Sequence, residues 1–163
     1  MRPSNSCLLT IGPLVLLGLA AVGCGSTSDG DGPATQAGCA EDSRVEAYEV
    51  GTEKLGDEEL VLFRMGTLDP DPVDVGDNGW NISLEAAATG EPLTGCSLSA
   101  TPWMPDHNHG SNNPTATEGA EAGDYQFTDI AFIMAGYWEV TLAVDCPDIE
   151  ATDTLMVNFC IEG

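Results

Sequence analysis

The sequence has little positive charge and little histidine. Its 163 residues include four lysines and arginines, 27 acidic residues and two histidines, for a net charge of −23. Nucleic acids are excluded as partners, because phosphate binding requires a basic surface that this composition cannot supply. Nucleophilic catalysis is poorly supported as well, since the two histidines are the only side chains suited to act as its base. We therefore expect a binding or structural protein and not an enzyme.

A helical repeat is also missing. Apolar residues nowhere keep helical spacing for more than about two turns, whereas alternation of apolar and polar residues is frequent. The alternating or β-prone runs are 59–65, 80–86, 96–101, 125–134, 138–144 and 155–159. Within 125–134 the apolar positions change phase, which predicts a β-bulge. Short strands of this kind, separated by turns, predict an all-β fold, an immunoglobulin-like antiparallel β-sandwich.

The first 23 residues have the pattern of a signal peptide. Arg2 precedes an apolar run over 7–22, which is shorter than the roughly 20 residues of a membrane-spanning helix. The small residues before Cys24 resemble a bacterial lipobox, which implies that Cys24 is lipidated, becomes the first residue of the mature chain and anchors it to a membrane. By the same resemblance, Gly25 in place of aspartate favours the outer membrane, facing the periplasm or the cell surface. Ordinary cleavage with release, or an uncleaved anchor, are the alternatives.

The rest of the chain divides into a linker and one domain. Residues 24–38 are small or polar and have the composition of a flexible linker. Residues 39–163 are long enough for a single domain with one hydrophobic core. After Cys24 the chain keeps all 27 acidic residues but only three basic ones, a net charge of −24. We interpret this acidity as a source of solubility.

Four cysteines remain once those of the signal peptide and the lipobox are set aside. They are Cys39, Cys96, Cys146 and Cys160. An even number of cysteines in an exported domain predicts two disulfides, for which three pairings are open. No two of them form a C-x-x-C motif, so neither a metal–thiolate site nor a redox motif is indicated.

The segment Trp103–Gly110 concentrates side chains that are rare elsewhere. It holds both histidines, His107 and His109, with one of the three tryptophans and one of the five methionines. Residues two apart in an extended backbone point to the same side, and Pro105 disfavours a helix. We therefore expect a loop that leaves the strand beginning near Cys96 and presents both imidazoles together.

Two longer stretches resemble the YtkA-like or FixH-like family of exported domains. They are GDNGWNISLEAAATGEPLTGCSLSATPWMPDHNHG, residues 76–110, and GDYQFTDIAFIMAGYWEVTL, residues 123–142. The shared motifs include the Met-Pro-x-His-x-His-Gly loop and the Met-x-Gly-x-Trp hairpin at 134–138. The resemblance covers about 59–160 and implies a small β-sandwich, but it fixes no activity. The chain departs from the family at Ala135, where proline is frequent, and at Asn108, where glycine is frequent.

The candidate ligands are imidazoles and thioethers, which suit soft to borderline metal ions. His107, His109 and Met104 lie in one segment, and Met134 ends a β-prone run just before a turn. If both turns lie at one end of the sandwich, the four side chains form a site whose ligand types favour copper, Cu(I) above all. We therefore predict a copper-binding protein for metal handling or delivery, with a metal-donor or metal-acceptor protein as partner.

Two neighbours have supporting roles in this hypothesis. Asp106 is expected to orient an imidazole through its second ring nitrogen, and Trp103 to shield the metal. The alternative is an immunoglobulin-like structural or protein-interaction module without metal. In that case the histidines are solvated, Met104 fills a gap and Met134 belongs to the core. A zinc hydrolase is disfavoured, because the two histidines and Asp106 are too close in sequence to surround one ion.

Overall fold

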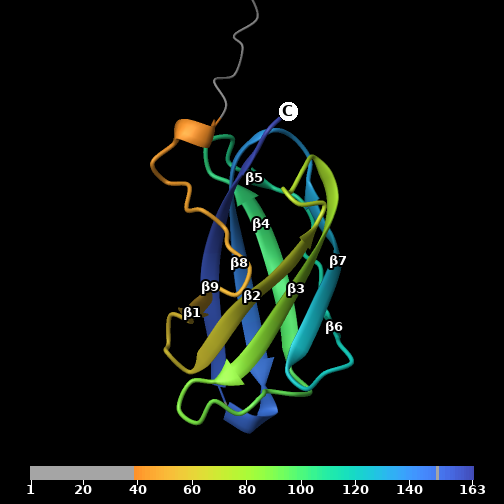
Figure 1. Cartoon of the computed structure of the whole chain (residues 1–163). Helices are drawn as coiled ribbons and strands as arrows, with labels where there is room; N and C mark the ends of the chain where they lie inside the picture. The colour runs from red at the N-terminus through yellow and green to blue at the C-terminus, as the bar shows by residue number, and fades with distance from the viewer. Residues whose placement is uncertain (1–38, 150) are drawn as a thin grey trace, which may run out of the picture. The chain divides into compact units, whose positions relative to one another are not determined.

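The computed structural model describes residues 39–149 and 151–163 of the chain (Figure 1). The expected signal peptide (1–23), the lipid-attachment residue Cys24 and the linker (24–38) lie outside the described residues. Among the residues that are described, no helix has the length and apolar character needed to cross a membrane.

The described chain forms two antiparallel sheets that pack face to face. The elements are η1 (Cys39–Glu41), β1 (Glu53–Leu55), β2 (Val61–Asp69), β3 (Gly76–Ala86), β4 (Ser97–Met104), β5 (His109–Gly110), β6 (Thr117–Glu118), β7 (Asp124–Phe132), β8 (Gly136–Cys146), η2 (Pro147–Ile149) and β9 (Ala151–Ile161). One sheet has the order β1-β2-β3-β7-β6, and the other has the order β5-β4-β8-β9. The predicted all-β sandwich is confirmed.

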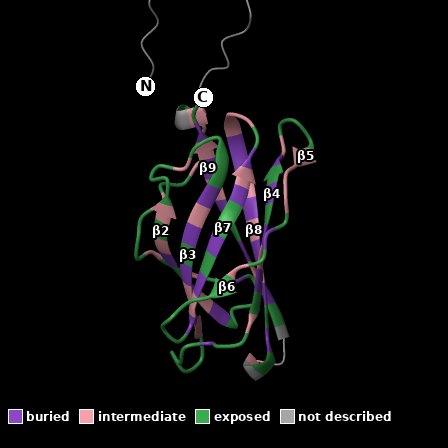
Figure 2. Ribbon diagram, turned by 90° about the vertical axis from the view of Figure 1, so that its right-hand side faces the viewer, coloured by how far each residue is buried: buried purple, intermediate pink, exposed green. Residues whose placement is uncertain are grey.

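The core lies between the sheets because alternate residues of each long strand point inward. Burial alternates along β3, β4 and β8, and Figure 2 shows the buried positions as stripes across the ribbons. The largest fully buried side chains are Trp138, Tyr125, Phe63, Phe127 and Phe132. All five belong to strands on which the sequence pattern predicts inward-facing apolar residues.

The predicted bulge lies on β7. Asn78 of β3 pairs with Ile130, whereas Trp80, two residues later, pairs with Phe127, so β7 holds one extra residue there. Phe127 and Ile130 are both buried even though they are three residues apart. The bulge thereby keeps both side chains in the core, which explains the phase change in the sequence.

The Asp-Pro-Asp-Pro stretch, residues 69–72, lies where strand β2 ends. β2 includes Asp69, and the two prolines that follow lie in a loop that leads to β3 at Gly76. Proline has no amide hydrogen to donate to a ladder, so the chain leaves the sheet at this point.

The disulfides join Cys39 to Cys160 and Cys96 to Cys146. The first ties the start of the domain to β9, and the second ties the residue before β4 to the end of β8. Of the three open pairings, this one is observed. Disulfides of this kind fit an extracytoplasmic location.

Candidate functional site

Both histidines lie on a β-hairpin formed by β4 and β5. β4 runs to Met104, which pairs with His109 across the hairpin. Residues 105–108 form the turn, in which the amide of His107 donates to the carbonyl of Met104 at 3.2 Å. The expectation that Trp103 and Met104 belong to a loop is wrong, because the burial alternation of β4 continues through both.

The two histidines therefore do not share one extended segment, which corrects the expected geometry. His107 lies in the turn and His109 in β5, with Asn108 between them at φ 56°. That is the left-handed region, which asparagine tolerates and glycine adopts freely, so the family's frequent glycine at this position is understandable. The imidazole rings are nevertheless close, with centroids 5.9 Å apart.

A second turn, residues 133–135, carries Met134 and joins β7 of one sheet to β8 of the other, so the expected hairpin at 134–138 is instead a connection between the two sheets. β4 and β8 are antiparallel neighbours, with Trp103 paired to Glu139, so the end of β4 lies beside the start of β8. The histidine hairpin and the Met134 turn therefore share one end of the sandwich, as the metal hypothesis required.

His107 and Met134 are in direct contact. The Nδ1 atom of His107 lies 3.3 Å from the Sδ atom of Met134, although the residues are 27 positions apart. His107 is exposed and Met134 is half-buried against the core. One nitrogen and one sulfur donor are thus adjacent and reachable from solvent.

Met104 approaches the same end from inside the core. Its side chain is 2% exposed, and its methyl group occupies the space that a side chain at Gly136 would need: a Cβ there would lie 2.2 Å from Met104 Cε. Gly136 also has φ 135°, a conformation that other residues rarely adopt. The glycine at the start of β8 therefore makes room for this thioether.

A pocket of about 840 Å³ opens beside this hairpin. Its lining residues are Cys39, Asp42, Met104, Asp106, His107, Ala135, Gly136, Tyr137, Ile161, Glu162 and Gly163. Of the four predicted ligands, Met104 and His107 line it. The pocket is bounded by the first turn of the domain, the histidine hairpin, the start of β8 and the residues after β9.

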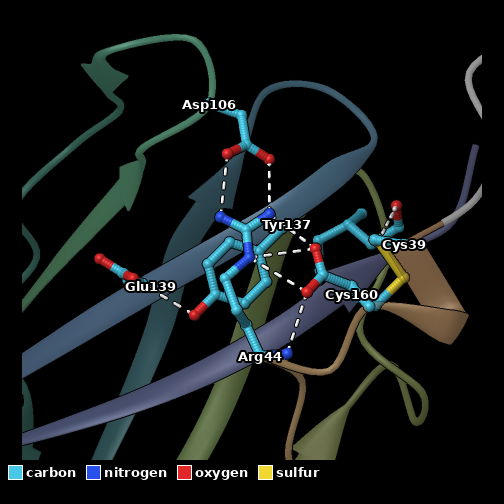
Figure 3. Close-up of polar contacts among 8 residues, drawn as sticks. Cys39, Arg44, Asp106, Tyr137, Glu139 and Cys160 are labelled. Carbon is cyan, nitrogen blue, oxygen red and sulfur yellow. Dashed lines mark hydrogen bonds and ion pairs between the residues drawn. A yellow bond between two sulfur atoms is a disulfide. The ribbon is translucent and has the colours of Figure 1, made fainter.

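Asp106 binds Arg44 instead of an imidazole (Figure 3). The guanidinium donates to both carboxylate oxygens at 2.9 and 2.8 Å, pairs also with Asp42, and lies 4.0 Å above the ring of Tyr137. Such bidentate pairs fix geometry as well as adding energy. Arg44 therefore fastens the histidine turn to the N-terminal segment of the domain. Neither sequence spacing nor composition indicated this contact across 62 residues.

Arg44, Asp42, Asp106 and Tyr137 form the Arg44 cluster, in which the pKa values of the acidic groups are shifted. Hydrogen bonds from Arg44 lower the pKa of Asp42 to about 2 and hold the pKa of Asp106 below its ordinary value. Burial raises the pKa of the Tyr137 phenol, whose hydroxyl donates to Glu139 at 3.2 Å. Both aspartates are therefore anionic at neutral pH, and Tyr137 is neutral.

A second tryptophan, Trp138, lies beside the histidines. Trp103 is 39% exposed on β4 and pairs with Gly110 across the hairpin. Trp138 is fully buried, and its ring meets that of His109 edge-on at 5.8 Å. The alternation of β8 predicted Trp138 as a core residue, but its proximity to His109 depends on the strand register and could not be seen in the sequence.

Carboxylates, thiols and imidazoles alone do not build a metal centre here. The part of the chain that the structure describes contains no group of three or more His, Cys, Asp or Glu side chains able to hold a metal ion. The other members of the candidate set are the thioethers of Met134 and Met104.

No curated protein matches the sequence. The fold is similar to the copper-bound E46Q variant of FetP from uropathogenic Escherichia coli strain F11, with 12% identity, a TM-score of 0.48, and coverage of 71% of this chain and 97% of that chain. A likeness at this level carries no functional conclusion.

The family comparison is more specific. The model of the family described as YtkA-like matches residues 66–143, from β2 through most of β8. That range includes the histidine hairpin, the Met134 turn and Trp138, which are the parts on which the sequence resemblance rested. Residues 66–143 therefore match a YtkA-like domain.

Proposed function

We propose that this domain binds a single copper ion at the histidine hairpin and serves copper handling or delivery in the cell envelope. His107 and Met134 are the central ligands, with His109 and Met104 completing the set. The single observation that carries this proposal is the 3.3 Å contact between His107 Nδ1 and Met134 Sδ.

The spacing of these two atoms fits two ligands of one ion. With metal–nitrogen and metal–sulfur bonds of about 2.0 and 2.3 Å, a tetrahedral ion separates its ligand atoms by about 3.5 Å. His107 and Met134 are thus close to a ligating geometry without a rearrangement of either turn. The ring centroid of His109 lies 5.9 Å from that of His107, and Met104 lines the same pocket as His107.

The donor types favour copper over the other common metals. Thioether sulfur selects Cu(I), whereas Zn(II) sites use thiolates, imidazoles and carboxylates. Asp106 is the carboxylate nearest in sequence to His107, and Arg44 already occupies both of its oxygens. The proposed ligand set is two imidazoles and two thioethers, a neutral site suited to a monovalent ion.

The site is suited to exchange and not to catalysis. His107 is exposed, and the pocket beside it is open, so an incoming ligand from another protein can reach the metal. Delivery then proceeds by replacement of His107 and Met134 with ligands of a metal-acceptor protein. We further propose that the chain is exported and lipid-anchored through Cys24 at the outer membrane, which keeps the domain in a compartment where copper is exchanged.

Cu(I) titration of the purified full chain, without a histidine tag and against a chromophoric Cu(I) chelator, tests the proposal. We expect one equivalent to bind, and we expect His107→Ala or Met134→Leu to weaken binding at least tenfold, because each removes a central ligand. Combining His107→Ala with His109→Ala should abolish binding. Bound Cu(I) should also raise the melting temperature, since the ligand binds the folded state.

Met156→Leu is the matched control for the methionine variant. Met156 is 51% exposed in the middle of β9, remote from the hairpin, and Cu(I) affinity should not change when it is replaced. Equal Cu(I) uptake by the double histidine variant would contradict the proposal. A melting temperature that does not respond to Cu(I) would favour the alternative, an immunoglobulin-like interaction module without metal.

A further inference from the structure

Trp138 contacts two of the four proposed ligand residues from the centre of the sheet. It lies on β8, and it is completely buried. Its indole N–H donates to the backbone carbonyl of Met134 at 2.9 Å. A buried indole needs such a partner, and here the partner lies in the turn between β7 and β8. The bond therefore fixes the backbone that presents the Met134 thioether.

The ring of Trp138 also contacts the β4–β5 hairpin. It meets the imidazole of His109 edge-on, with centroids 5.8 Å apart and planes at 71°. On the β7 side it packs against Phe132 at 5.5 Å, two residues before Met134. One rigid side chain thus touches both the β4–β5 hairpin and the β7–β8 turn.

We propose that Trp138 is the positioning residue of the copper site: it sets the distance between the histidine hairpin and the Met134 turn, and its indole senses the bound ion. The inference rests on the proposed copper binding and adds a residue that binds no metal itself. Residues that orient metal ligands typically contribute 10- to 100-fold to affinity. A buried indole close to the ion also gives a spectroscopic signal that a remote tryptophan does not.

The test is Trp138→Phe in the full chain, which keeps a ring and removes the N–H donor. Cu(I) affinity, measured by chelator competition, should fall at least tenfold, equivalent to about 1.4 kcal/mol. Trp80→Phe is the matched control. Trp80 is also buried (2% exposed), and its N–H donates to the hydroxyl of Tyr48 at 2.6 Å, so its replacement removes a comparable hydrogen bond away from the hairpin. It should lower the melting temperature but leave Cu(I) affinity unchanged.

Tryptophan fluorescence provides a second measurement that does not depend on the folding of Trp138→Phe. In a variant with Trp80→Phe and Trp103→Phe, Trp138 is the sole emitter, and Cu(I) should quench its emission with a one-to-one endpoint. Absence of quenching while Cu(I) binds would overturn the role of Trp138. So would equal Cu(I) affinities for Trp138→Phe and the wild type. If the wild type itself takes up no Cu(I), the proposed function fails first, and the role of Trp138 fails with it.

Discussion

His107 and Met134 meet because the turn of the β4–β5 hairpin and the connection from β7 to β8 lie at the same end of the sandwich. Their ligand atoms are 3.3 Å apart, and neither residue is shielded completely from solvent. Contacts between an imidazole and a thioether have no strong structural purpose of their own, since sulfur is a weak hydrogen-bond acceptor. At the residue scale, this imidazole and thioether are better suited to binding a metal ion than to stabilising the fold.

Gly136 is the residue on which the position of Met104 depends most directly. Gly136→Ala places a methyl group 2.2 Å from Met104 Cε and strains the backbone at φ 135°. We expect a loss of unfolding free energy of about 2 to 3 kcal/mol from overpacking and strain together, measured by urea denaturation. Cu(I) affinity should fall as well, because the thioether is displaced.

Gly76→Ala separates the effect of backbone strain from the effect of overpacking. Gly76 has a similar φ of 119° but no neighbouring atom within 4 Å of the new methyl group, so its replacement adds backbone strain alone. A loss in Gly136→Ala no larger than that in Gly76→Ala would show that Met104 does not depend on the glycine.

The proposed metal ligands could be predicted from the types of residue in the sequence, but the residues that hold those ligands in place could not. The imidazoles and thioethers could be proposed because these side chains are rare and concentrated in 103–110 and at Met134. Arg44 and Trp138 could not, since their roles depend on a guanidinium reaching across 62 residues and on the register of β8. Likewise, Asp106 was expected to orient a histidine, but it binds Arg44, which lies far away in the sequence.

At the scale of elements, β9 joins the two sheets through one buried carboxylate. Asp153 is 1% exposed near the start of β9 and accepts hydrogen bonds from the amides of Glu58, Leu60, Val61 and Thr154, at 2.8 to 3.0 Å. Glu58 and Leu60 belong to the connection from β1 to β2 in the opposite sheet, and Val61 is the first residue of β2. The carboxylate therefore provides these amides with a hydrogen-bond acceptor.

Asp153→Asn should be strongly destabilising. The amide side chain loses the charge and directs an NH₂ group at backbone N–H donors, so buried amides are left without an acceptor. We expect a loss of about 3 kcal/mol of unfolding free energy by urea denaturation. Asp145→Asn, which changes an exposed carboxylate on β8, should cost less than about 0.5 kcal/mol. Similar losses for the two variants would contradict this role of Asp153.

Strands were more predictable than the connections between them. Alternation predicted β3, β4 and β8, and the phase change within β7 predicted its bulge, because inward-facing positions must stay apolar. The extension of β4 to Met104 was missed because the alternating run was taken to end at residue 101, whereas the alternation of burial continues to Met104. The two-residue strands β5 and β6 are too short to leave a pattern, and the disulfide pairing depends on which strands are neighbours.

For the molecule as a whole, the Arg44 cluster introduces a pH dependence of stability. The pKa of Asp42 is lowered to about 2 and that of Asp106 is lowered too, both by Arg44. A carboxyl group with a lowered pKa stabilises the folded state above its ordinary pKa of about 4, and this contribution is lost as the pH falls through the lowered value. The wild type should therefore lose a specific contribution between about pH 4 and pH 2.

Arg44→Gln lacks this contribution at every pH. The difference in melting temperature between wild type and Arg44→Gln should be largest at pH 5 and shrink towards pH 2. Lys54→Gln provides the control, because it removes one positive charge, paired with Glu46, outside the cluster. A wild-type advantage over Arg44→Gln that stays constant from pH 5 to pH 2 would show that the ion pairs do not act as described.

The Cys39–Cys160 disulfide also determines how the domain carries mechanical force. A pull on the chain before Cys39 passes across the sulfur–sulfur bond directly into β9, without travelling through the residues between. β9 is paired with β8 at eleven consecutive positions, whereas β1 is paired with β2 at three. Tension is therefore distributed over the longest ladder in the described part of the chain and bypasses the short strand β1. The segment containing Arg44, and with it the histidine turn, stays outside the path of the force.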